Sequence, residues 1–175
     1  MTLDRSWYST LVDDSGSGLD GSIWDKASVD ALMDAVDATQ VGCVLSRSID
    51  QAIAPSVATA VFWDTEAHDP AGLHAPASAL ITLPADGTYL LSAQVTWQAS
   101  ASGNRAITFR LNSATAYPTF IWIGNLGASV QVASHLTAIL RGAIGMTVEV
   151  LVLHDGGGAL NVIGGSLVFG CQRMS

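Results

Sequence analysis

Residues that commonly carry out catalysis are few in this chain, and none of them has catalytic spacing. The histidines are His68, His74, His135 and His154, and the sequence contains no HExxH and no GxSxG motif. A zinc hydrolase would need ligands at such spacing, and a serine hydrolase of the common type would need the nucleophile elbow. We therefore expect a protein that is not an enzyme and that uses no cofactor.

Two short polar segments offer alternative chemistry. Glu66, His68 and Asp69 could ligate a cation in the loop after Trp63, but a polar surface loop is the interpretation we favour. Asp155 and the glycines that follow it indicate a hairpin turn rather than a phosphate cradle, because no helix pattern comes after them. We expect no bound metal.

The two cysteines, Cys43 and Cys171, are not spaced as a CxxC pair. Buried small apolar side chains are the interpretation we favour for both. The N-terminus lacks a basic stretch followed by an apolar core, so no secretory signal is expected. The chain is therefore expected to fold in a cytoplasm, where thiols stay reduced.

The composition favours self-association. Charged residues make up 13% of the chain and the mean hydropathy is +0.38, whereas a soluble domain usually has about 25% charged residues. No apolar run approaches the ~18 to 20 residues that span a bilayer, so membrane insertion is not expected. Burial of a second surface against copies of itself explains the missing charge. The net charge of −8 and a single lysine exclude a nucleic-acid binding surface.

Charge is unevenly divided along the chain. Residues 1–50 contain nine Asp and three basic residues, whereas residues 51–175 contain six acidic and four basic residues. Residues 1–40 are rich in Asp, Ser and Gly, which favour turns and loops. Isolated large apolar side chains between these turns indicate a segment that orders against a partner. The predicted anchor residues are Trp7, Tyr8, Leu11, Ile23 and Trp24; the alternative is that they pack onto the chain's own head.

One helix is predicted, over residues 28–38. Ser28 can cap it, and apolar residues follow at i, i+3, i+4 and i+7 from Val29. From Val41 onward the hydrophobic period is two. Turn-separated short runs without a further helix predict a mostly β sandwich or jelly roll in a head domain over residues 41–175. The strands are predicted at 41–46, 57–63, 79–83, 88–97, 106–111, 130–140, 147–153 and 160–171.

Two of these strands have no charge on either face. In 88–97 and 130–140 the alternate positions opposite the apolar set are neutral, and no charged residue occurs before Arg141. A strand that faces water normally carries charged residues on its outer side, so both faces are predicted to be buried in an oligomer. The predicted subunit contacts are Leu90, Gln94, His135, Thr137 and Ile139.

A family resemblance covers about residues 41–175. The stretch from Ala79 to Leu91, with Pro84, Gly87 and Tyr89, resembles the strand–turn–strand signature of the globular heads of complement and adiponectin, relatives of tumour necrosis factor. Residues 105–112 resemble the next strand of that family, residues 140–150 a later hairpin, and 164–170 the closing strand. The resemblance implies a ten-strand jelly roll that forms a trimer. It also implies that the first strand lies beside the last, which would place Cys43 near Cys171.

The N-terminal residues resemble leader segments of bacteriophage virion proteins. Our leading hypothesis is therefore a structural or binding protein of a phage virion, assembled in the host bacterial cytoplasm. Its trimeric head would be attached through residues 1–40 to a capsid or tail protein, as a tail fibre, head fibre or capsid decoration. The alternative is a bacterial secreted binding module of the complement-head class. Two interpretations of the aromatic residues Tyr117, Phe120 and Trp122 remain open: they pack in the core or the subunit interface, or they form a platform that binds a receptor or host glycan.

Overall fold

The computed structural model describes residues 29–32, 34, 41–123 and 130–174, and for 115–120 and 122 it describes the backbone alone. The chain divides into two units after Val41. In the first unit residues 29–32 and 34 are helical, within the predicted span of 28–38, and Val41 is described outside the helix. No helix among the described residues is long and apolar enough to cross a membrane.

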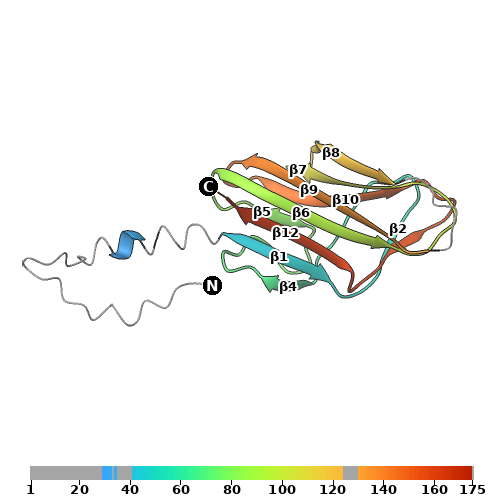
Figure 1. Ribbon diagram of the computed structural model, residues 1–175, viewed down its shortest axis with the longest axis horizontal. Coiled ribbons are helices and arrows are strands. Elements are labelled where there is room, and N and C mark those ends of the chain that lie inside the picture. The colour runs from blue at the N-terminus through green and yellow to red at the C-terminus, as the bar shows by residue number, and fades with distance from the viewer. Residues whose placement is uncertain (1–28, 33, 35–40, 124–129, 175) are drawn as a thin grey trace, which may run out of the picture. The chain divides into compact units, whose positions relative to one another are not determined.

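The second unit is built from two antiparallel sheets (Figure 1). One sheet contains seven strands: β1 (Gly42–Arg47), β2 (Gln51–Ile53), β4 (Thr65–His68), β6 (Gly87–Trp97), β9 (Val132–Gly142), β11 (Leu160–Val162) and β12 (Leu167–Arg173). The other contains five: β3 (Thr59–Ala60), β5 (Leu80–Thr82), β7 (Arg105–Leu111), β8 (Thr115–Ile123) and β10 (Thr147–His154).

The strand order of the larger sheet explains the fold. β6 pairs with β12 on one edge and with β9 on the other, and β1 lies between β12 and β4. β11 and β12 both pair with β6, so together they form one interrupted strand. In the same way β2 pairs with β11 and β1 pairs with β12, so β1 and β2 form a second interrupted strand. When each interrupted strand is counted once, the described strands make the ten of a jelly roll. The first strand lies beside the last, as the resemblance implied.

Alternating apolar residues of both sheets form the core between them. In β9 the burial alternates strictly along all 11 residues, and β6 alternates in the same way. Aromatic rings fill the middle, where the Phe169 centroid lies 5.7 Å from that of Trp63 and 5.9 Å from that of Phe109. The two inner faces thus pack as those of a β-sandwich do.

The predicted strands differ from the observed ones in three places. The predicted strand 160–171 is interrupted at 163–166, where Gly165 has a φ of 74° and a Cβ on Gly164 would overlap the Ile49 backbone. Only Thr59–Ala60 of the predicted strand 57–63 forms a strand, and the next residue, Val61, donates a further backbone hydrogen bond to Val150 of β10. The strands β2, β4 and β8 lie outside the predicted set. β2 and β4 are too short to show a period, and β8 has aromatic residues without clear alternation.

Cys43 and Cys171 are direct partners across β1 and β12, and both are buried free thiols. Their proximity confirms the strand order that the resemblance implied. Burial raises the pKa of both thiols, that of Cys171 to about 12, and the neighbouring Cys171 raises the pKa of Cys43 further. A neutral thiol in an apolar layer is a poor nucleophile, because only the thiolate attacks.

We predict slow alkylation of both cysteines in the native protein. At pH 8 a thiol of pKa about 12 has about 1,000-fold less thiolate than one with the ordinary value of 9.0. Iodoacetamide should therefore leave native Cys171 unmodified, and denaturation without reductant should yield two alkylated cysteines per chain by intact mass. A disulfide-linked mass after denaturation would contradict the expected reduced state.

The raised thiol pKa values also predict how stability depends on pH. Because the thiols of the unfolded chain lose their protons first, the free energy of unfolding should fall as the pH rises above 9.0.

Candidate self-association surface

The outer face of the larger sheet carries neutral side chains in register across four strands. In one row Ile139 lies opposite Leu90, which lies opposite Gln172; in the next, Thr137 lies opposite Ser92. Figure 1 looks onto these four strands, β1, β12, β6 and β9, side by side. We call this surface the neutral face. It comprises Val44, Ser46, Leu90, Ser92, Gln94, His135, Thr137, Ile139, Val168, Gly170 and Gln172.

All five of the predicted contact residues lie on this face. Leu90 and Gln94 come from β6, and His135, Thr137 and Ile139 come from β9, where they alternate with buried residues. The strands bring them together because β6 and β9 pair along their whole length, with Gln94 opposite His135. Their period of two and their lack of charge are the sequence features that predict this set.

The register extends the face onto β1 and β12, which were not part of the predicted set. Val44 is 40% exposed and Val168 is 42% exposed, and both lie in rows with the predicted residues. Their alternation with buried neighbours was the signal available in the sequence. Ile139, at 60% exposed, is the most exposed large apolar residue of the face.

The neutral face contains no Asp, Glu, Lys or Arg. A side-chain hydrogen bond crosses its strands between Ser92 Oγ and His135 Nε2, which lie 3.1 Å apart. The outer face of the smaller sheet differs, because Arg110 donates to Glu149 there at 2.6 Å across β7 and β10. This bond raises the pKa of Arg110 and holds both charges on that sheet. The strands of the larger sheet also contain charged residues, among them Glu66, Arg141 and Arg173. The absence of charge is therefore a property of the neutral face rather than of a whole sheet.

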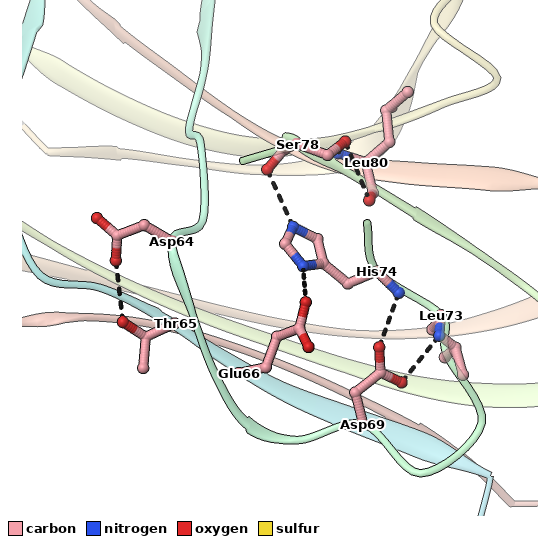
Figure 2. Close-up of polar contacts among 8 residues, drawn as sticks. All are labelled: Asp64, Thr65, Glu66, Asp69, Leu73, His74, Ser78 and Leu80. Atoms are coloured by element: carbon pink, nitrogen blue, oxygen red, sulfur yellow. Dashed lines mark hydrogen bonds and ion pairs between the residues drawn. The ribbon is translucent and has the colours of Figure 1, made fainter. Parts of the chain in front are cut away.

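The segment with the candidate cation ligands is occupied by internal hydrogen bonds (Figure 2). Asp69 accepts from the backbone nitrogens of Leu73 and His74, both at 2.8 Å. Glu66 contacts Nδ1 of His74 at 2.8 Å, and Nε2 of His74 donates to the Ser78 carbonyl at 3.1 Å. Both carboxylates thus serve to close the loop between β4 and β5, as a structural surface loop would require.

The buried His74 at the centre of this loop was not among the candidate cation ligands. Its side chain is 1% exposed, while that of Glu66 is 37% exposed. Across residues 29–32, 34, 41–123 and 130–174 no group of three His, Cys, Asp or Glu side chains is arranged to hold a metal ion. His68 lies on β4, opposite Val44 of β1, and does not join Glu66 and Asp69 in a common site.

Two other predicted sets fall largely outside the described parts. The anchor residues of 1–40, namely Trp7, Tyr8, Leu11, Ile23 and Trp24, lie outside the described residues. The backbone of the predicted platform forms β8, which pairs with β7 and places Trp122 opposite Ala106 and Phe120 opposite Thr108. The side chains of Tyr117, Phe120 and Trp122 lie outside the described parts.

Several solved structures share the architecture of the head. The globular domain of a zebrafish complement 1qA protein has a TM-score of 0.58 and 14% identity, covering 78% of this chain and 98% of its own. The fold is a TNF-like jelly roll. Murine APRIL (TM-score 0.58, 12% identity, 76% of this chain and 98% of its own) and the Eiger TNF of S. frugiperda (TM-score 0.58, 10% identity, 78% and 94%) support the same architecture. Neither a family model nor a curated protein matches the chain.

Proposed function

We propose that this TNF-like head is a structural and binding protein of a bacteriophage virion. Three heads associate through the neutral face, and residues 1–40 attach the trimer to a capsid or tail protein. The observation that carries this proposal is the neutral face itself, with Ile139 at 60% exposure among uncharged neighbours. An exposed large apolar residue among uncharged neighbours is costly for solubility and typical of a surface that is covered by a partner.

The size of the neutral face fits one side of a subunit contact. Four strands spaced about 4.8 Å apart and six residues long at about 3.4 Å each cover roughly 400 Å². A standard interface buries about 800 Å² on each partner, so the edges of neighbouring strands must contribute as well. A ring of three copies satisfies this requirement, because each head then contacts two neighbours through different surfaces. The number three rests on the likeness to the TNF-like heads.

We expect the purified chain to be a tight trimer. Light scattering at micromolar concentration should give three times the chain mass of 18.1 kDa. The mass should resist salt, because the face contains no ion pairs that salt would screen. A stable 18.1 kDa monomer would contradict self-association, and a dimer would show that the threefold arrangement is wrong.

The virion role makes a separate prediction about where the protein is found. Mass spectrometry of particles purified by density gradient should detect the chain at fixed stoichiometry with the capsid protein. The genes beside it are expected to encode capsid, portal or tail proteins. The likeness to a complement head favours the alternative, a secreted binding module, which would instead be recovered from the particle-free supernatant.

A further inference from the structure

A cavity of about 280 Å³ opens at one end of the TNF-like head. It lies between the loop that follows β6 and the loop that joins β10 to β11. The lining combines an amide, hydroxyls, an imidazole and glycine backbone, with no charged side chain: Gln98, Ala99, Ser100, Ser102, His154, Gly156, Gly157, Gly158, Ala159 and Leu160.

The cavity lies at the far end of the sheet from the start of β1. Gly42 pairs with Gln172, which pairs with Leu90 near the beginning of β6, whereas the cavity begins at Gln98, just after β6 ends. In Figure 1 this is the end toward which the β6 arrow points. The 11 residues of β6 span about 35 Å. A ligand in the cavity is therefore well separated from the residue at which residues 1–41 join the head.

Buried polar side chains hold the walls of the cavity in place. Arg105 is 1% exposed, and its guanidinium donates to the carbonyls of Ser100 (2.9 Å) and Gly103 (3.1 Å). Within the described parts of the chain Arg105 forms no ion pair, so these two loop carbonyls are the groups that hold its charge. A buried charge without a counter-ion costs several kcal/mol, which a simple connecting loop would not require.

The loop that joins β10 to β11 is also held by a buried polar side chain. His154 is 1% exposed; its Nε2 donates to the Ile53 carbonyl at 2.9 Å and its Nδ1 accepts from the Gly156 nitrogen at 3.2 Å. The two loops also join each other, because Asn104 Nδ2 donates to the Asp155 carboxylate at 2.8 Å. Hydrogen bonds from Asn104 lower the pKa of Asp155 and keep it ionised. These contacts pre-organise the cavity, which reduces the entropy lost on binding.

The groups that remain available in the cavity are mainly hydrogen-bond donors without charge. Among the described residues, the N–H groups of Gly157 and Gly158 and the hydroxyl of Ser102 have no protein partner. Gln98 accepts from the Asn161 nitrogen through its carbonyl oxygen, which leaves its NH₂ group to donate. Such a set suits a ligand with several neutral oxygen atoms. The cavity is smaller than the roughly 300 to 1,000 Å³ of drug-sized sites, so the ligand is small.

We propose that this cavity binds a neutral, hydroxyl-rich ligand of about the size of one sugar ring. The proposal is independent of the virion role and of the neutral face, because residues of a single chain form the cavity. It also differs from the predicted platform on β8, which contributes no residue to the lining.

The test is a titration of the full chain with methyl glycosides of glucose, galactose, mannose and N-acetylglucosamine. Amide chemical shifts of Gly157 and Gly158 report directly on the cavity. We expect saturable shifts with at least one of these sugars. Gly158→Leu should weaken binding about tenfold or more, because Gly158 lines the cavity and a Cβ there meets no atom within 4 Å, so a leucine can narrow the cavity without displacing the loop. Ser102→Ala should weaken it about threefold to tenfold, because it removes one donor.

A matched control is Ala143→Leu, at an exposed position in the turn between β9 and β10 at the other end of the head. It should bind like the unchanged chain. Light scattering of each sample separates a failure of the cavity from a failure of assembly. The proposal is overturned if none of the neutral sugars gives saturable shifts, if Gly158→Leu binds as well as the control, or if only sialic acid or glucuronic acid binds.

Discussion

Replacing Ile139 by arginine should convert the trimer into folded monomers. Ile139 is 60% exposed in the single head and lies in the neutral face with Leu90 opposite it. An arginine there would bury an unpaired charge once in each subunit, at a cost of several kcal/mol each. Arg141 lies two residues along on the same side of β9, so the new charge would also meet a like charge. Aspartate is a weaker test, because Arg141 would partly compensate it.

Sedimentation or light scattering of Ile139→Arg should give 18.1 kDa, and circular dichroism should still show the β-sheet spectrum. The matched control is Ile144→Arg, the same substitution at a residue that is 71% exposed in the β9–β10 turn, off the neutral face. That variant should remain trimeric. Unchanged mass for Ile139→Arg would show that the subunits meet through another surface.

Removal of residues 1–40 should abolish incorporation into virions while leaving the head intact. The head should persist because β1 starts at Gly42, and its partners, β12 and β4, both lie within 42–175. Attachment should be lost because the apolar anchor residues, including Trp7 and Trp24, are removed. Buried tryptophans at interfaces typically contribute about 2 kcal/mol or more each.

The measurement compares two chains, full length and starting at Val41, expressed during infection with a phage that lacks the gene. Quantitative mass spectrometry of gradient-purified particles gives the copy number. The truncated chain should fall to background, yet light scattering should give it the trimer mass. The full-length double variant Trp7→Ala with Trp24→Ala should lower the copy number, and full-length Ile144→Arg serves as its control. Normal incorporation of the truncated chain would place the attachment site in the head.

Local sequence patterns are sufficient to predict the two longest strands, β6 and β9, and their faces, although they miss β8. The alternation in 88–97 and 130–140 matches the burial of β6 and β9 residue by residue, because successive side chains of a strand point to opposite sides. The neutral character of Leu90, Thr137 and Ile139 follows from the same alternation. The fold itself depended on the resemblance around Pro84 and Tyr89, since alternation alone does not order strands in a sheet.

Only the tertiary structure decided which strands are neighbours and which loops meet. Val44 and Val168 join the neutral face because β1 pairs with β12 and β12 pairs with β6, although these strands lie far apart in the sequence. The cavity has the same origin: Arg105 and His154 reach their carbonyl partners only once β7 and β10 are paired. His74 likewise meets Glu66 through the path of one loop. A period of two specifies the face of each side chain, whereas register and loop contacts arise from packing of the two sheets.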